Sequence, residues 1–359
     1  MKNLRRLLSA ALSAGALSSG LFGALVDSSL VQFDEAVRNY NLISFGNASF
    51  ARYGDTEGGL AVGGNLFLDG GAIAAQPGKF TPSADPTLYV AGQLSINQNA
   101  TLESGYASIN ALSNLSWSWN GLDKRLLRDG SVFSTVNSSA PLAGVDPRVN
   151  PGAADWDWAA LQDGFVGISS VLAGSDASGK IVITDQTLRF SALKPAAGGA
   201  IVFDLDADLL LGNTYGGAMF SNIQFDVPSG SAYVVNVRNA AGRTLFGTGN
   251  FNLGSGYERL LWNIVDETPG VSDDVRFGNG GQFFGAVLAP TFNVFNDLGT
   301  AINGQVVAGT FTHSGAELHF TGFEYDYEVP EPGTYGALGA AACLGLVFLR
   351  RRRARSAPR

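Results

Sequence analysis

Three acidic side chains, Asp204, Asp206 and Asp208, occupy every second position in the sequence FDLDADLLL. Asp-x-Asp-x-Asp is how a calcium-binding EF-hand loop begins, because carboxylate oxygens are hard ligands that suit Ca²⁺. The match ends there, since the sixth position is Leu209 instead of glycine and the twelfth is Tyr215 instead of glutamate. Apolar residues alternate with the aspartates, which predicts an exposed acidic face of one strand. Weak Ca²⁺ binding along this face is the alternative.

The only two histidines, His313 and His319, lie on either side of Glu317. On one strand all three side chains would point to the same face, as a metal site requires. The spacing argues against a shared ion, because residues six apart on a strand lie about 20 Å from each other. We therefore predict no metal site, and we expect Glu317 and His319 to hold the end of a strand by hydrogen bonds.

No pattern of a nucleophile or cofactor site stands out. The sequence has no Gly-x-Ser-x-Gly elbow and no glycine-rich phosphate loop, and its only cysteine, Cys343, lies near the C-terminus. The acidic turns at 55–57 and 273–274 are predicted to be solvated loops. A carboxylate pair that hydrolyses glycosides stays open, because sequence spacing alone does not exclude it. We predict that the chain is not an enzyme and needs no cofactor.

The charge distribution divides the chain into three parts. Nine of the 23 basic residues lie in the first 26 positions or after residue 333, which leaves 14 basic and 31 acidic residues between them and a formal charge of −17. Such a surface repels nucleic acid and favours cations or basic partners. Without a disulfide in this part, stability must come from packing and backbone hydrogen bonds.

The N-terminus has the layout of a secretory signal peptide. Lys2, Arg5 and Arg6 precede an apolar stretch rich in small residues, which ends at Asp27. We predict a signal over residues 1–26 that the Sec export machinery reads; an amphipathic helix of the folded domain is the alternative.

The C-terminus combines three elements in a fixed order. Val329, Pro330, Glu331 and Pro332 precede an uncharged run from Thr334 to Leu349, and the arginines Arg350, Arg351, Arg352 and Arg353 follow. Positive residues after an apolar segment stay on the cytoplasmic side of a membrane. The whole resembles a PEP-CTERM sorting signal, which implies recognition by an exosortase, a membrane transpeptidase-like enzyme. A plain membrane anchor is the alternative.

Repeated strand patterns fill the body between these ends. Residues 60–68 match residues 88–96 in strict alternation of apolar side chains with a central glycine, and residues 285–289 match 304–308. Such repeats predict stacked strands of an irregular β-solenoid, with a β-sandwich as the alternative.

One segment has helical spacing instead. Between Asp155, a predicted N-cap, and Leu172, apolar side chains recur at 158, 161, 165 and 168. This pattern predicts one amphipathic helix that packs its apolar stripe on the β body.

Seven ordered segments of the body resemble the choice-of-anchor A family of bacterial surface domains. Besides the helix, they are YNLISFGN, EGGLAVGGNLFL, LLWNIVDET, FFGAVLAPTFNV, INGQVVAGTF and AELHFTGFEY, between Tyr40 and Tyr325. The resemblance implies an adhesin-like β-helical domain, which the family pairs with alternative C-terminal anchors.

We therefore predict an exported protein of the cell surface or extracellular matrix of a Gram-negative-type bacterium, with a structural or adhesive role. Its parts are a signal peptide (1–26), the β-helical domain (27–328), the sorting signal with a transmembrane segment (329–353) and a basic tail (354–359). The expected partners are the exosortase, exopolysaccharide or matrix proteins, and the membrane before processing. A secreted polysaccharide-acting enzyme is the alternative. Ice binding is a third possibility, for which Thr310 and Thr312 are the only hint.

Overall fold

The computed structural model describes residues 19–325 with gaps, and they belong to one compact unit that ends at Tyr325. The undescribed positions inside this stretch are 53, 77, 80–84, 99, 106, 114–115, 120–123, 129–130, 137–155, 193–199, 212–213, 229, 247–249, 253–255, 269–272, 279–280 and 297–298. The first 18 residues, the predicted sorting signal and the basic tail lie outside the described residues. Within the part that is described, no helix is both long and apolar enough to cross a membrane.

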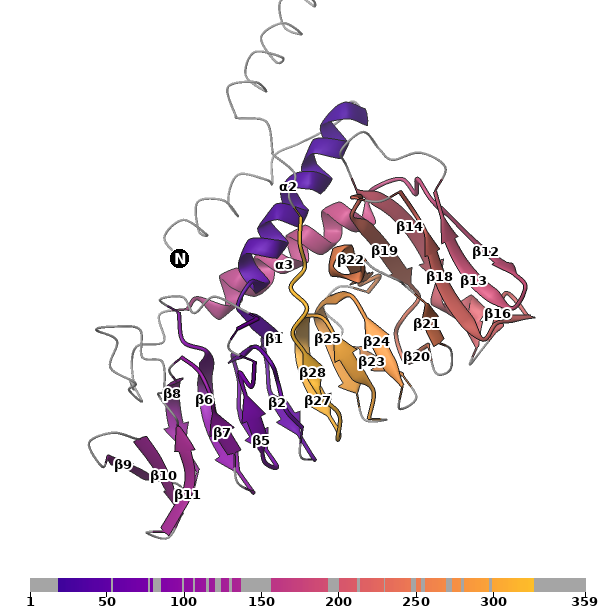
Figure 1. Ribbon diagram of the computed structural model, residues 1–359. Helices are drawn as coiled ribbons and strands as arrows, with labels where there is room; N and C mark the ends of the chain where they lie inside the picture. The colour runs from indigo at the N-terminus through magenta and orange to yellow at the C-terminus, as the bar shows by residue number, and fades with distance from the viewer. Residues whose placement is uncertain are drawn as a thin grey trace, which may run out of the picture. The chain divides into compact units, whose positions relative to one another are not determined.

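The N-terminal half, up to residue 136, contains one helix and a series of short strands (Figure 1). They are α2 (Ser19–Val37), β1 (Tyr40–Ser44), β2 (Ala48–Phe50), β3 (Gly59–Val62), β4 (Leu66–Leu68), β5 (Gly71–Ile73), β6 (Leu88–Ile96), β7 (Ala100–Leu102), β8 (Ala107–Leu112), β9 (Ser116–Trp119), β10 (Lys124–Arg128) and β11 (Ser131–Val136).

The C-terminal half begins with the second helix and continues in strands and two 3₁₀ turns. They are α3 (Trp158–Ala173), β12 (Lys180–Thr184), β13 (Thr187–Ser191), β14 (Ile201–Asp206), η1 (Ala207–Leu209), β15 (Leu210–Leu211), β16 (Thr214–Tyr215), β17 (Ala218–Met219), β18 (Asn222–Asp226), β19 (Tyr233–Arg238), β20 (Arg243–Leu245), β21 (Asn250–Asn252), η2 (Tyr257–Arg259), β22 (Leu260–Ile264), β23 (Asp274–Phe277), β24 (Gln282–Phe284), β25 (Ala286–Asn296), β26 (Ala301–Asn303), β27 (Val306–His313) and β28 (Leu318–His319).

The strands wind into a β-solenoid with three faces. The first face, which the helices cover, contains β14, β19, β22, β1 and β3 and the first parts of β25, β27 and β6. The second face contains β20, β23, β2 and β4 and the second parts of β25, β27 and β6. The third face contains β13, β18 and β21, then β24, β26 and β28, and β5, β7 and β11. Successive turns pair in parallel, so the structure confirms the solenoid and excludes the β-sandwich.

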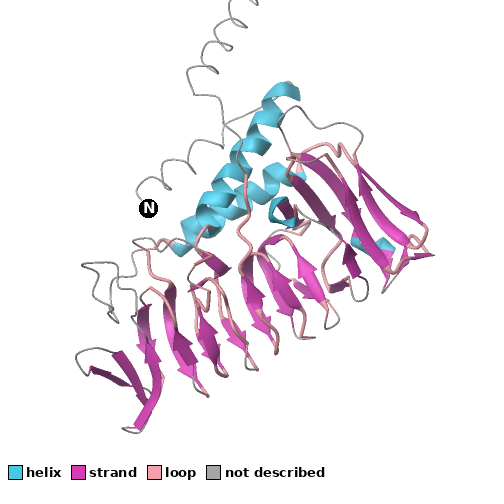
Figure 2. Cartoon of the chain, in the orientation of Figure 1, coloured by secondary structure: helices cyan, strands magenta, loops and turns pink. Residues whose placement is uncertain are grey.

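The order of the turns in space differs from their order in the sequence. The N-terminal turns run from β1 and β2 outward to β8, and α3 then lies along the first face, so that the C-terminal turns start at the other end with β14 (Figure 2). They return to the middle, where β27 pairs in parallel with β1 at Leu42 and Val306 and with β2 at Phe50 and His313. We call this junction of the first and last turns the seam.

The two internal repeats are neighbouring turns in register. Leu60 lies beside Leu88 and Leu66 beside Leu94, as the offset of 28 residues predicts. At the corner between these strands the Gly92 N–H donates to the Gly64 carbonyl at 2.9 Å, and a Cβ on Gly92 would lie 2.5 Å from that oxygen. The central glycine of the pattern is thus required by the close approach of two backbones.

The predicted helix is present, with a different start. The carboxylate of Asp157 accepts a hydrogen bond from the Ala160 N–H at 3.1 Å and caps α3, so the N-cap is Asp157 and not Asp155. Leu161, Phe165 and the later members of the stripe are buried against the first face, whereas Trp158 is half-buried.

Helix α2 extends across the predicted boundary between signal peptide and domain. Val26, Leu30 and Phe33 are buried, and the ring of Phe33 packs edge-on against Phe165 of α3 and against Phe323. The part of α2 from Val26 onward therefore packs in the folded body, and the predicted boundary at residue 26 lies inside this helix.

The interior of the solenoid is apolar along its whole length. Side chains that point inward from the three faces form one continuous cluster that includes Val62, Phe203, Trp262, Phe283 and Phe311. Since inward side chains fill this core, and no described helix covers the second and third faces, the outward side chains of these faces are available for binding.

Candidate functional site

The second face is a flat surface whose outward side chains form two rows, each crossing the strands of the solenoid. The first row contains Asn293 of β25, Thr310 of β27, and Asn47, Asn65 and Gln93 at the corners of the N-terminal turns. The paired positions of the second row are Thr244, Arg276, Phe295, Thr312, Ser49, Phe67 and Ser95.

Hydrogen bonds hold the first row in place. The side-chain oxygen of Asn47 accepts from the Asn65 N–H at 2.8 Å, and the oxygen of Asn65 accepts from the Gln93 N–H at 2.8 Å. Farther along, the Thr310 hydroxyl donates 2.7 Å to Asn293. The side chains of Asn47, Asn65, Asn293 and Thr310 are therefore held in place before any ligand arrives, which lowers the entropy cost of binding.

The second row mixes small hydroxyls with two aromatic rings. Phe67 is 37% exposed, one of the few large apolar side chains that face solvent in the described structure. The guanidinium of Arg276 lies 4.5 Å from the ring centre of Phe295, a cation–π contact. Thr312 and Ser49 lie side by side across the seam.

These rows repeat at the spacing of neighbouring strands, about 4.7–4.9 Å. A flat, rigid array with this period matches a ligand that is itself extended and regular, such as a polysaccharide chain or a crystal surface. Small molecules need a concave site instead.

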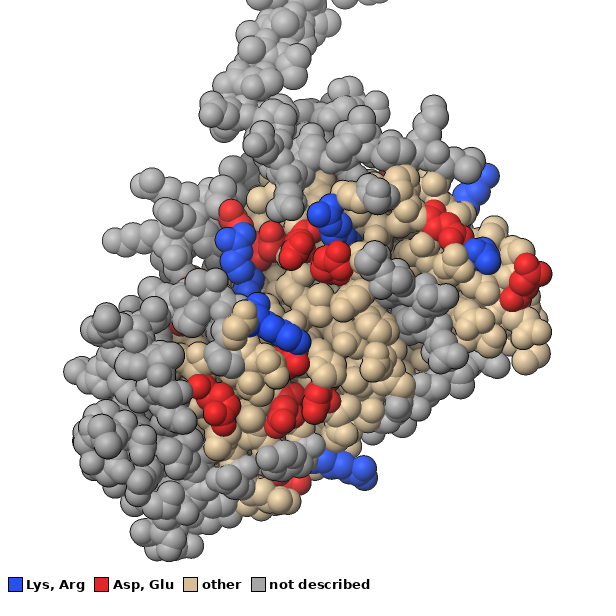
Figure 3. All heavy atoms as spheres, viewed as in Figure 1, with Lys and Arg blue, Asp and Glu red and all other residues tan. Residues whose placement is uncertain are grey.

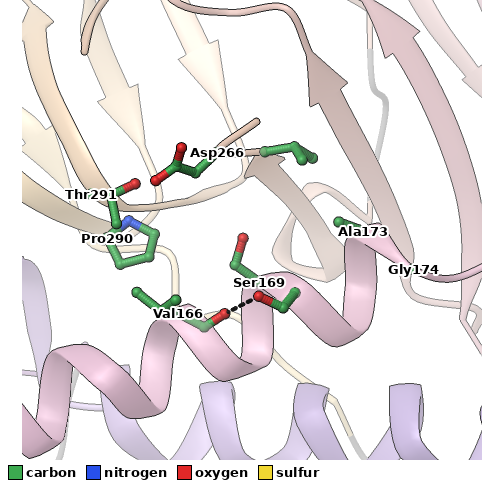
Figure 4. Close-up of a pocket in the computed structure, with 9 residues that line it drawn as sticks. Val166, Ser169, Ala173, Gly174, Asp266, Pro290 and Thr291 are labelled. Atoms are coloured by element: carbon green, nitrogen blue, oxygen red, sulfur yellow. Dashed lines mark hydrogen bonds between the residues drawn. The ribbon is translucent and has the colours of Figure 1, made fainter. Parts of the chain in front are cut away.

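A small cavity of about 270 Å³ lies between α3 and the ends of β22 and β25, where Asp266 and Thr291 face the helix (Figure 4). Two of its polar groups already bond within the protein, because the hydroxyl of Ser169 donates 2.7 Å to Asn263 and Asp266 accepts from the Thr268 N–H, whereas the buried hydroxyl of Thr291 makes no hydrogen bond within the described residues. It is smaller than the roughly 300–1,000 Å³ of typical small-molecule sites, and we assign it no ligand.

The three aspartates proposed as weak Ca²⁺ ligands do not lie on one strand face. β14 ends at Asp206, whose carboxylate accepts from the Asp208 N–H at 3.0 Å and so starts the 3₁₀ turn η1. Asp204 binds Arg238 at 3.1 Å, and Asp208 pairs with Arg243. The turn also leaves Leu209 exposed, against the predicted alternation.

The histidines lie on different strands and different faces, and not on one face of a single strand as the sequence analysis considered. His313 of β27 is buried, where its Nδ1 accepts from the amide of Asn296, its Nε2–H donates to the Ala316 carbonyl, and burial lowers its pKa. His319 of β28 lies between Glu317 and Glu57, at 3.5 and 3.3 Å. Within the described residues no group of histidines and carboxylates has the geometry of a metal site.

The prediction that the acidic turn at 55–57 is solvated is wrong for Glu57. Glu57 is 9% exposed, and its carboxylate accepts from Lys79 at 2.6 Å and from the Phe320 N–H at 2.7 Å. Burial works against its ionised form, but the hydrogen bonds from Lys79, His319 and Phe320 outweigh burial and lower its pKa. Glu57 therefore joins the N-terminal and C-terminal turns on the third face instead of binding solvent. Elsewhere in the view of Figure 3, charged side chains lie in separate groups on a mostly uncharged surface.

Sequence reasoning missed the first row of the second face. Its signal is the polar residue after the glycine in each repeat, Asn65 after Gly64 and Gln93 after Gly92. The repeat fixes these two residues on neighbouring turns, but only the structure shows that Asn47 and Thr310 continue the row.

The chain matches the model of one protein family over residues 33–320, and this family is described as "Putative Ice-binding-like adhesive domain". No curated protein matches the chain.

Solved structures of ice-binding proteins are similar to it at low identity. The protein LeIBP from an Arctic yeast is 13% identical, with 83% of this chain and 95% of that chain covered and a TM-score of 0.34. An ice-binding protein from the Antarctic ascomycete Antarctomyces psychrotrophicus is 11% identical, with 80% and 96% covered and a TM-score of 0.26. One from an Antarctic biological consortium is 13% identical, with 85% and 93% covered and a TM-score of 0.30. At such low identities and TM-scores the likeness says nothing about what this chain binds.

Proposed function

This chain belongs to the family of ice-binding-like adhesive domains, and on that premise we propose that it is a non-enzymatic adhesin that attaches to an ordered polysaccharide through the second face of its solenoid. The observation that carries this proposal is the row of exposed polar residues Asn47, Asn65 and Gln93 beside the exposed ring of Phe67, with the side chains of Asn47 and Asn65 held by hydrogen bonds. Amide and hydroxyl groups hydrogen-bond sugar hydroxyls, and an aromatic ring packs against the apolar face of a sugar.

Adhesion through many weak contacts suits this surface. Each contact on an open, wet face contributes little, but a row that crosses successive turns engages several sugar units of one chain at once, and linked contacts raise the overall affinity. A hydrolase would instead need two carboxylates about 5–9 Å apart around the scissile bond, and the paired positions of the two rows include, among the described residues, a single carboxylate, Asp274 beside Asn293. This supports the proposal of a binding role over the polysaccharide-acting enzyme.

The test is co-sedimentation of the full chain with insoluble polysaccharides, including the exopolysaccharide of the source cells. Phe67→Ala and Ser49→Arg alter the centre of the second face, and each should weaken binding at least about tenfold, or about 1.4 kcal/mol. Gln282→Arg places the same arginine on the third face as the matched control and should bind as the native chain does. Equal binding by all variants would exclude the second face as the attachment surface.

Ice is the second candidate ligand of the same face. Thr310 and Thr312 point outward from β27, and Ser49 continues the row of hydroxyls on the next turn. Thermal hysteresis of the full chain that is lost in Thr312→Arg but kept in Gln282→Arg would favour ice over polysaccharide.

The ends of the chain determine where this adhesin acts. The proposal includes Sec export through the N-terminal signal, recognition of Val329, Pro330, Glu331 and Pro332 by an exosortase, and a final position at the cell surface or in the extracellular matrix. Its support is the order of the three C-terminal sequence elements and the resemblance to choice-of-anchor A domains.

A further inference from the structure

The end of the solenoid that contains β14 has an open strand edge. β12 pairs with β13 through five consecutive residues, and in the described structure no strand pairs with its other side. Lys180, Val182 and Thr184 are exposed on its outer surface, whereas Ile181 and Ile183 pack against the core.

Apart from the exposed Lys180, this edge lacks the proline and the bulge that usually prevent strand pairing. β12 contains no proline, and its register with β13 runs without a bulge from Lys180 to Thr184. Free edges without such protection bind other strands. Val182, Leu209 and Met219 are 45%, 43% and 64% exposed, and they are three of the four large apolar side chains exposed among the described residues. They belong to β12, η1 and β17, which lie at this end of the solenoid.

We propose that β12 is a self-association site, where it pairs antiparallel with β12 of a second copy around a two-fold axis at Val182. Antiparallel pairing of one strand with itself is self-complementary, as a two-fold interface requires. In this register Val182 lies opposite its own copy and Lys180 lies opposite Thr184, so all five residues of the strand are paired. Another register leaves some of these backbone groups without a partner.

Charge complementarity favours the second copy as the occupant. The exposed Lys180 begins the strand and the exposed Asp185 follows it in the turn. Antiparallel pairing at Val182 brings Lys180 of each copy next to Asp185 of the other, so two opposite-charge contacts form by symmetry. A parallel arrangement would place like charges together.

The dimer would carry two copies of the second face, one from each chain. If the adhesive role proposed above is correct, the dimer binds a polysaccharide with two domains, and linked domains bind more tightly than one. The dimer itself depends only on β12, so it is tested without any ligand.

The most direct test introduces cysteines, because Cys343 is the only native thiol of the chain. In a full chain with Cys343→Ser, a single Val182→Cys substitution places two sulfurs opposite each other, because paired Cα atoms lie about 4.5–5.5 Å apart and disulfides span about 4.4–6.8 Å. Mild oxidation should give a covalent dimer in high yield. Thr184→Cys alone should not cross-link, since the two copies of residue 184 lie about 13 Å apart along the strand. The double variant Lys180→Cys and Thr184→Cys should cross-link, because residue 180 of each copy lies opposite residue 184 of the other.

Sedimentation equilibrium of the native chain gives the second measurement. Lys180→Glu sets two acidic residues side by side and should raise the dimer dissociation constant about tenfold or more, because like-charge contacts oppose pairing. Arg38→Glu, the same charge change on the exposed end of α2, is the control and should leave the constant unchanged. A monomeric native chain, or cross-linking that is equal in the Val182→Cys and Thr184→Cys variants, would overturn the proposal.

Discussion

The carboxylate of Asp27 accepts a hydrogen bond from the hydroxyl of Tyr325 at 2.5 Å, although 298 residues separate them in the sequence. Both side chains are buried, at 6% and 8% exposure. The contact joins helix α2 to the last described residue of the domain, which precedes the predicted sorting signal in the sequence. The two ends of the adhesive domain are therefore held together at one point.

This contact predicts a dependence of stability on pH. Burial raises the pKa of Asp27, and the hydrogen bonds from Tyr325 and the Ala200 backbone offset burial only in part. A carboxyl whose pKa is raised in the folded state contributes stability that is present below its unfolded pKa of about 3.9 and is lost as pH rises through its folded pKa. Asp27→Asn should therefore unfold at an equal or higher denaturant concentration than the native chain at pH 7, and the advantage should shrink toward pH 4.

Tyr325→Phe is the companion variant for this prediction. It removes the donor and leaves the buried carboxylate with less compensation, so we expect a loss of about 1–3 kcal/mol in the free energy of unfolding at pH 7. If the native chain instead gains stability relative to Asp27→Asn between pH 4 and pH 7, the predicted direction of the pH dependence is wrong.

Helix α3 should contribute strongly to stability through its buried stripe. Leu161 is 9% exposed between the helix and the first face. Leu161→Ala removes three buried carbon atoms and should lower the free energy of unfolding by about 2–5 kcal/mol. Ala159→Ser, on an exposed position of the same helix, is the control in chemical denaturation. A loss below about 0.5 kcal/mol would mean that the stripe does not pack in the core.

Calcium binding should be weak. Asp204, Asp206 and Asp208 already contact Arg238, Asn239 and Arg243 of the following turn, so a cation must displace these partners. We expect a dissociation constant of about 10⁻⁴–10⁻³ M, as in weak extracellular sites, and little effect on unfolding. Calorimetry that finds micromolar affinity in the native chain, lost in Asp206→Asn, would identify a specific metal site.

The ends of the mature protein can be read by intact-mass spectrometry of the native product. Because Val26 and Asp27 are buried in α2, signal cleavage should fall before Val26, at Ala16 or Gly20, and not between residues 26 and 27. The product should also end near Pro332. A mass that retains Arg350 to Arg353 would contradict sorting at this signal.

The sequence predicted what is local and periodic. Alternation of apolar residues at 60–68 and 88–96 identified two neighbouring turns, because inward side chains must be apolar on every turn. The helix stripe was recognised for the same reason, although its N-cap was wrong by two residues and its first member, Trp158, is only half-buried.

The interactions between distant segments could not be predicted. Glu57 was expected in solvent because its partners, Lys79 and the Phe320 N–H, lie 22 and 263 residues away. The seam has no local signature either: Asn41 donates to the Gly304 carbonyl and Gln305 to the Val37 carbonyl, and neither pair follows a pattern in the sequence.

The seam has a consequence for how the protein is made. A chain that leaves the cell from its N-terminus presents Leu42 long before its strand partner Val306. Topologies with such distant partners fold slowly, since a large loop must close before its contacts form. If the chain is exported as proposed above, the turns around β1 stay incomplete until almost the whole domain has crossed the membrane, so the strand order delays folding until export is nearly complete.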